Sequence, residues 1–152
     1  MVSRGFGTLG KTASSISVFL YVGLGILLYR LLRPAGKILS LVAMLFNFAG
    51  GIVTLMASFR NGQAPVNPLL FFGTYCLLYG ALIIRSAFLP HLLGVLNIIA
   101  GIGWFIYLLP LRAHFVTLSI EVFGFLAEAI LMIWLLAKGV DEQAWNRQRS
   151  RY

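Results

Sequence analysis

The sequence of 152 residues is poor in charged side chains and contains one cysteine and five prolines. Charged residues make up 11% of the chain, whereas an average soluble domain has about 25%. This scarcity of charge excludes an ordinary soluble domain. A single cysteine, Cys76, excludes an internal disulfide. We expect Cys76 to be a small packing residue rather than a metal ligand or a redox centre.

Apolar residues take the place of the missing charge. They make up 60% of the chain, and the mean hydropathy is +0.92. Since about 20 helical residues cross a bilayer, the apolar runs predict an all-α fold, an integral membrane bundle of five transmembrane helices with short loops. The expected helices are 12–32, 37–59, 68–84, 91–109 and 115–137, separated by proline- and glycine-containing breaks. They form a single transmembrane domain, 1–152, which ends in a basic tail, 138–152.

The basic residues predict how the chain is oriented. Arg4 and Lys11 precede the first apolar run, as in a signal peptide, but that run ends at Arg30 and Arg33 and therefore reads as a retained helix. Lys and Arg number eight on the side that holds the C-terminus and four on the other side. The positive-inside rule thus predicts an outer N-terminus and a cytoplasmic C-terminus. This distribution explains the net charge of +8 without a nucleic-acid partner.

Small and polar residues recur on one face of four expected helices. Residues at positions i, i+3 and i+7 lie on one face of a helix. The four stripes, with a weaker one in the first helix, are Asn47, Gly50 and Thr54; Gly73, Cys76 and Gly80; Gly94, Asn97 and Gly101; Glu121, Gly124 and Glu128; and Ser14, Ser17 and Tyr21. Two interpretations remain open. The stripes pack helices closely in lipid, or some of them line a polar cavity.

Glu128 is the strongest functional candidate. It falls near the middle of the last span, and Glu121 lies seven residues earlier, about 10.5 Å closer to the outer surface. No Lys or Arg occupies the middle of any span. An ionised carboxylate at this depth is costly, so we expect Glu128 to be protonated at neutral pH. Its expected partners are Asn97, Asn47, or Tyr75 and Tyr79, while Glu121 is expected to face Arg112 and His114.

Three roles remain open for these acids. Glu128 is a structural, hydrogen-bonded acid, or a proton or ligand site with Glu121 as its outer station and with Asn97 and Asn47 nearby, or a contact for a partner protein. His91 and His114 fall at opposite membrane faces, so they are not expected to share a metal. Motifs of metalloproteases, serine hydrolases and P-loop enzymes are absent from the sequence. We therefore expect no catalytic residue, no metal and no cofactor.

Aromatic residues near the expected helix ends indicate anchoring at the membrane interface. Trp104 and Tyr107 fall near the outer end of the fourth helix, and Tyr29 and Trp134 near inner ends. The basic tail contains Trp145, and it is expected to lie on an anionic inner leaflet.

Three stretches resemble the domain-of-unknown-function family 4386 of bacterial membrane proteins. They are LLYRLLRPAGKILSLVAMLF, YGALIIRSAFLPHLLGVLNIIAGIGWFIYLLP and AEAILMIWLLAKGVDEQAW, and the segment from Ile84 to His91 is the most distinctive. The resemblance implies a bacterial cytoplasmic (inner) membrane, short cytoplasmic loops at 30–37 and 85–91, and an acid at Glu128. Members usually begin with an additional N-terminal helix, so we expect a trimmed member or one that relies on partner subunits.

Helix-packing stripes without a catalytic motif favour a non-enzymatic protein. The expected function is that of an accessory or scaffold subunit, packed in a larger membrane assembly or a homo-oligomer within the lipid bilayer. The alternative is a small transporter or proton-linked carrier that uses Glu128. An enzyme acting on lipids has the least support.

Overall fold

The computed structural model describes residues 2–60, 63, 65–109 and 114–150, and its regular elements there are all helices. In chain order they are α1 (Val2–Leu32), the short 3-10 helix η1 (Arg33–Ala35), α2 (Lys37–Phe59), α3 (Pro68–Arg85), α4 (His91–Tyr107), α5 (His114–Ala137) and α6 (Glu142–Arg149). The all-α fold class predicted from the sequence is thus confirmed.

Four of these helices contain segments that are long and apolar enough to cross a membrane: Ser15–Ala35, Lys37–Phe59, Pro68–Arg85 and Phe115–Ala137. The fifth, α4, is apolar but has only 17 residues. Such a helix rises about 25 Å, somewhat less than the ~30 Å hydrocarbon core. The chain is therefore a multi-pass helical membrane protein with four long apolar helices and one shorter one.

Proline and polar caps set the helix boundaries. Asn67 caps α3, because its side-chain Oδ1 accepts a hydrogen bond of 3.0 Å from the backbone N–H of Leu69. Pro68 follows as the first helical residue, where its missing N–H costs nothing. Pro90 immediately precedes α4, and Pro34 lies in η1 between α1 and α2. These breaks reverse the chain within a few residues.

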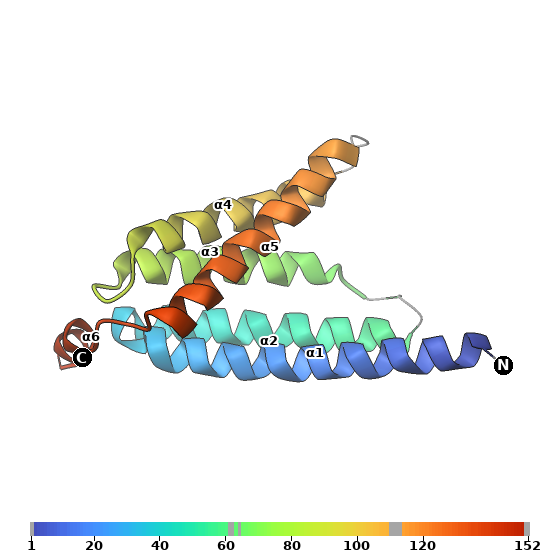
Figure 1. The fold of residues 1–152 in the computed structure, drawn as a ribbon, viewed down its shortest axis with the longest axis horizontal. Helices are drawn as coiled ribbons and strands as arrows, with labels where there is room; N and C mark the ends of the chain where they lie inside the picture. Colours follow the sequence, from blue (N-terminus) through green and yellow to red (C-terminus); the bar gives the residue numbers. More distant parts are fainter. Residues whose placement is uncertain (1, 61–62, 64, 110–113, 151–152) are drawn as a thin grey trace.

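Helices α1 to α4 pack against one another in chain order, α3 and α4 most closely, and α5 is attached at the side of α4 (Figure 1). Helices α1 and α2 run side by side, as do α3 and α4, whereas α5 crosses the second pair obliquely. The largest fully buried apolar side chains, Leu32, Tyr79, Leu82 and Ile83, come from α1 and α3. Helix α5 packs mainly against α4.

Glycines bring α3 and α4 into backbone contact. A methyl group added at Gly80 would lie 2.7 Å from the carbonyl oxygen of Gly94, and one at Gly94 would lie 2.7 Å from that of Gly80. Gly73 and Gly101 face each other in the same way, at 3.2 and 2.9 Å. We call these four residues the α3–α4 glycine contact. The missing side chains let the two backbones approach closely, which holds the short α4 against α3.

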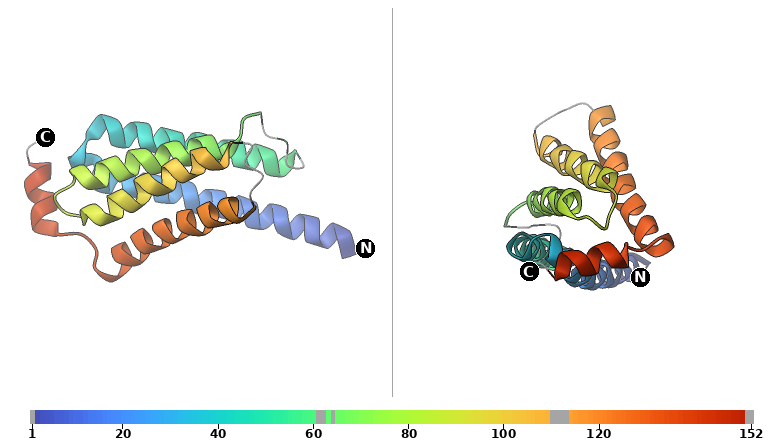
Figure 2. Two further views of the ribbon diagram at one scale, coloured as in Figure 1. Left: turned by 90° about the horizontal axis from the view of Figure 1, so that it is seen from above. Right: turned by 90° about the vertical axis from the view of Figure 1, so that its left-hand side faces the viewer.

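Helix α6 caps one end of the bundle, lying across the helix ends (Figure 2). The indole N–H of Trp145 donates to the carbonyl of Leu31 at 2.9 Å. Gln148 accepts from the N–H of Ala87 and donates to the carbonyl of Arg85. These bonds satisfy backbone groups near the ends of α1 and α3.

Two features of the helices differ from the ranges predicted from the sequence. Helix α1 begins at Val2 rather than at residue 12, because neither Lys11 nor the polar residues before it break a helix. The basic tail, for which the sequence indicates no particular element, contains α6. The first turn of α6 is capped by the Asp141 side chain. The remaining predicted boundaries lie within two residues of those observed.

Candidate functional site: an intramembrane glutamate beside a cavity

Glu128 lies near the middle of the span Phe115–Ala137 and points toward α3. The hydroxyl of Tyr75 donates a hydrogen bond to its Oε1, and the thiol of Cys76 donates to the same oxygen at 3.6 Å. Both donors are buried. Among the described residues, no hydrogen bond ends on Oε2, so this oxygen is available to a proton or a guest.

The Glu128 partners match the sequence prediction only in part. Tyr75 is the predicted partner that the structure brings to the carboxyl group. The Tyr79 hydroxyl instead donates to the carbonyl of Gly25 at 3.4 Å. The Asn97 amide donates to the carbonyl of Leu93, one turn earlier in its own helix, at 2.9 Å. The predicted contact of Glu128 with Tyr79 or Asn97 is therefore wrong, because a nearer backbone carbonyl takes each donor.

Asn47 also lies away from the carboxyl group. It is almost completely buried between α2 and α1, where its Oδ1 faces Gly25 so closely that an added methyl group would clash with it. Within the described residues this oxygen accepts no conventional hydrogen bond. Asn47 therefore marks the close approach of α1 and α2 and is not a partner of Glu128.

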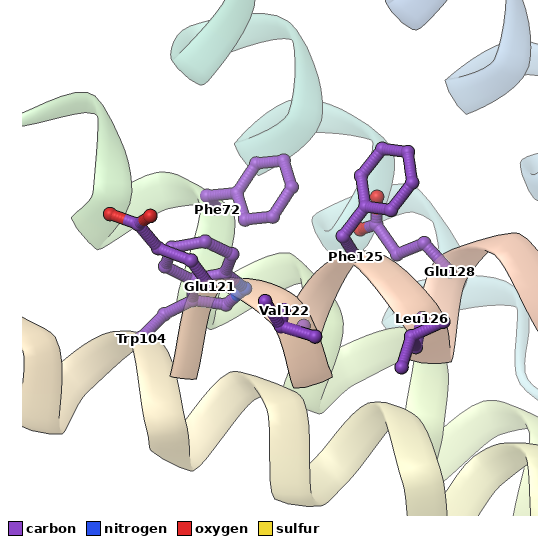
Figure 3. Close-up of a pocket in the computed structure, with 8 residues that line it drawn as sticks. Phe72, Trp104, Glu121, Val122, Phe125, Leu126 and Glu128 are labelled. Atoms are coloured by element: carbon purple, nitrogen blue, oxygen red, sulfur yellow. The ribbon is translucent and has the colours of Figure 1, made fainter. Parts of the chain in front are cut away.

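A cavity of about 480 Å³ opens beside Glu128, between α5 and the α3–α4 pair. We call it the Glu128 cavity; its lining residues are Phe72, Trp104, Glu121, Val122, Gly124, Phe125, Leu126 and Glu128. The two carboxyl groups lie toward opposite ends, with the rings of Phe72 and Trp104 beside Glu121 and the ring of Phe125 beside Glu128 (Figure 3). Phe125 is 75% exposed, so this side of the cavity faces the lipid.

Trp104 forms the α4 wall of the cavity. Its ring meets the ring of Phe72 edge-on, with centroids 5.2 Å apart, and packs so closely on Gly124 that an added methyl group would lie 2.7 Å from it. Within the described residues its buried indole N–H donates no hydrogen bond. Sequence position suggests an interfacial anchor, but Trp104 instead packs between α4 and α5.

Glu121 occupies the other end of the cavity. The predicted partners, Arg112 and the His114 side chain, lie outside the described residues. The two glutamates do share one cavity, although they do not share a proton-binding position. The seven-residue spacing predicts that both glutamates lie on one face of the helix. The structure shows in addition that aromatic side chains line the cavity between α5 and its neighbours.

A column of aromatic rings connects Glu128 to α1. The rings of Tyr21 and Tyr75 meet edge-on, with centroids 5.5 Å apart. Phe72 and Tyr79 flank Tyr75 on the same helix, at 4.9 and 5.5 Å. Tyr21 belongs only to the weakest stripe in the sequence, so the periodicity gives little indication of this role.

Tyr21 also reaches a second cavity, on the other side of Phe72. This α1–α2–α3 cavity has a volume of about 570 Å³ and is lined by Ser17, Val18, Tyr21, Gly50, Gly51, Thr54, Pro68, Leu69 and Phe72. Phe72 thus lines both cavities. The side chains of Tyr21 and Tyr75 thus lie between the second cavity and the Glu128 carboxyl group.

The remaining candidates lie elsewhere. His91 is exposed at the start of α4. Among the described residues, no group of three His, Cys, Asp or Glu side chains is arranged to hold a metal ion.

Comparison with known proteins identifies a family. Residues 66–139 match the family described as Domain of unknown function (DUF4386). A protein from Archaeoglobus fulgidus, named only as an uncharacterized protein, is 32% identical over 128 residues, which cover 80% of this chain and 78% of that protein. No solved structure matches the chain. The chain therefore belongs to the DUF4386 family, whose function is unknown.

Proposed function

We propose that the protein is a small, non-enzymatic, proton-linked carrier in which Glu128 binds a proton and a guest molecule in turn. The observation that carries this proposal is the position of the Glu128 carboxyl group. It lies near the middle of a span, is held by two donors of α3, and lines a cavity of about 480 Å³. Ionisable groups at such a depth are costly and are usually functional.

The two hydrogen bonds to Oε1 support a carboxyl group that changes protonation in place. Tyr75 and Cys76 can donate to Oε1 whether the proton is on Oε2 or absent. They orient the group in both states, so Oε2 is the atom that faces a guest. A purely structural acid has no need of a free oxygen beside a cavity.

Proton access is supported by the hydroxyl groups of Tyr21 and Tyr75. Tyr21 lines the α1–α2–α3 cavity and its ring meets that of Tyr75, whose hydroxyl donates to Oε1 of Glu128. A guest can approach from the opposite side, where the Glu128 cavity borders the lipid-exposed side chains of α5.

The test uses the purified chain in proteoliposomes with an imposed pH gradient. The vesicles are incubated with a small-molecule extract of cells, and the retained molecules are identified by mass spectrometry. We expect at least one compound to accumulate in a gradient-dependent way with the wild-type chain and with Glu142→Gln, which alters an exposed acid of α6. Accumulation should be lost in Glu128→Gln. Equal contents in all three samples, with and without the gradient, would contradict the proposal.

The second candidate is a scaffold subunit, and the attachment of α5 favours it. This helix packs mainly against α4, and its apolar side chains Phe115, Phe125 and Leu136 are 75–87% exposed. A partner helix or a second copy of the chain could cover this flank. Native mass spectrometry in mild detergent distinguishes the candidates: a stable complex supports the scaffold, and a monomer with a bound small molecule supports the carrier.

We also propose that the chain lies in the bacterial inner membrane with the α6 end in the cytoplasm. The exposed residues Arg30, Arg33, Lys37, Arg85, Lys138, Arg147 and Arg149 gather at this end of the sequence-derived topology, which supports the orientation. A cysteine introduced at Ser150 of a Cys76→Ser chain should resist an impermeant thiol reagent in intact cells. Labelling of this cysteine in intact cells would show that the orientation is the opposite one.

A further inference from the structure

The Glu128 cavity combines carboxyl groups with aromatic rings. Phe72, Trp104 and Phe125 contribute the rings, and Glu121 and Glu128 contribute the acids (Figure 3). Aromatic faces attract ammonium ions through the ring quadrupole, and groups of such rings recognise ammonium ions that carry apolar substituents. The rest of the lining is apolar, which suits the substituents of such an ion. The lining therefore fits an organic cation better than an anion or a sugar.

No Lys or Arg lies in the middle of the span of Glu128 or of the helices around it. Lys and Arg are absent from 12–29, 38–59, 68–84, 86–111 and 113–137 of the sequence. An ionised Glu128 in a low-dielectric cavity is stable only beside a cation. Without one, the group holds a proton. The positive charge that stabilises the ionised state must therefore arrive with the guest.

We propose that the guest is an organic cation with apolar substituents, such as a quaternary ammonium ion, which displaces the proton of Glu128. This inference rests on the proposed carrier function and names its substrate class. The cation lies beside Oε2, its substituents contact Phe72 and Phe125, and the released proton passes to solvent. No covalent bond forms, and charge is conserved at the site because one positive charge replaces another.

Competition between proton and cation makes binding depend on pH. The titratable groups that face Glu128 are Tyr75 and Cys76 from α3 and Tyr21 from α1, with Glu121 on α5 itself; the described part of α4 adds no titratable side chain to the cavity lining. Where Glu128 is mostly protonated, affinity for the cation should rise about tenfold per pH unit. The affinity should become independent of pH once the group is ionised.

The experiment measures binding of benzyltrimethylammonium to the purified chain in nanodiscs. Its neutral carbon isostere, neopentylbenzene, has the same shape without the charge and serves as the control ligand. Empty nanodiscs give the background. The variants are Glu128→Gln, Phe72→Leu and the matched control Glu142→Gln, and each is first shown to unfold at the wild-type temperature so that lost binding is not lost structure.

We expect saturable binding of the cation, and not of the isostere, to the wild-type chain. Glu128→Gln should weaken binding about tenfold or more, and Phe72→Leu about threefold, with Glu142→Gln unchanged. Equal binding of cation and isostere, or wild-type affinity in Glu128→Gln, would overturn the inference.

Calorimetry in two buffers of different ionisation enthalpy separates this inference from the carrier proposal. Release of about one proton per bound cation supports both the cation as the guest and the proton-linked carrier. Cation binding without proton release leaves the guest class standing and contradicts the proton-linked carrier. Gradient-driven accumulation of a neutral compound, lost in Glu128→Gln, together with no cation binding leaves the carrier standing and contradicts the guest class.

Discussion

The two faces of α4 show two different ways of packing helices in a membrane. Toward α3, glycines at Gly80 and Gly94 place backbone against backbone, with added methyl groups only 2.7 Å from the opposing carbonyl oxygens. Toward α5, the Trp104 ring meets Gly124, and the space beside this contact remains open as the Glu128 cavity. The first face holds the bundle together, and the second leaves room for a guest. A glycine among apolar residues therefore gives a closed contact where it meets another glycine, as at Gly80 and Gly94, and borders an open space where it meets a large ring, as at Gly124 and Trp104.

The largest expected effect follows from filling the α3–α4 glycine contact. Gly80→Leu should destabilise the protein by about 3 kcal/mol, because the opposing atoms are backbone atoms that have no rotamer with which to move away. Reversible unfolding in mixed micelles measures the free energy. The matched control is Gly23→Leu in α1, where a methyl group meets no atom within 4 Å. Equal stabilities of the two variants would refute the close contact.

A smaller loss is expected at the α4–α5 face. Gly124→Ala should destabilise by about 1 kcal/mol, because the ring of Trp104 is a side chain and can shift. The shift should also narrow the Glu128 cavity and weaken cation binding. The same unfolding measurement and the nanodisc binding measurement test this. A loss as large as that of Gly80→Leu would show that the two faces are equally rigid.

Tyr75→Phe should cost about 0.6 kcal/mol, the average for a side-chain hydrogen bond between membrane helices. The variant removes the donor to Glu128, while it keeps the ring. We also expect slower proton exchange at Glu128, because the hydroxyl group next to its carboxyl group is removed. Stopped-flow measurement of proton release after mixing with the cation checks this. An unchanged rate would contradict the proposed route.

The smallest effect on stability is expected for Glu128→Gln, within about 0.5 kcal/mol of wild type. The amide oxygen of Gln can still accept from Tyr75 and Cys76, and the variant removes only the exchangeable charge. Unfolding in micelles checks the value. A loss of several kcal/mol would show that Glu128 is a structural acid, which would favour the scaffold.

The sequence predicts the helices of this protein far better than their mutual rotation. Apolar length and the breaks at Pro34, Pro68 and Pro90 are local properties, and they are enough to predict the all-α bundle. The partner of Glu128 is not local. Asn97 has suitable chemistry and depth, but its amide is satisfied within α4, and Tyr21 of α1 reaches the site only through the tertiary packing that sets its ring against Tyr75. The α6 helix is missed for another reason: a short polar helix is stabilised by contacts such as that of Trp145 with Leu31, which no periodicity reveals.

The central claim is that Glu128 exchanges a proton for a cation, and infrared difference spectroscopy tests it most directly. Spectra of the wild-type chain in nanodiscs are recorded at pH 7 with and without benzyltrimethylammonium, beside those of Glu128→Gln. We predict that the cation removes a protonated-carboxyl band and adds a carboxylate band in the wild-type chain, with neither change in the variant. A carboxyl band that persists while the cation is bound, or a Glu128 that is already ionised in its absence, would contradict the account.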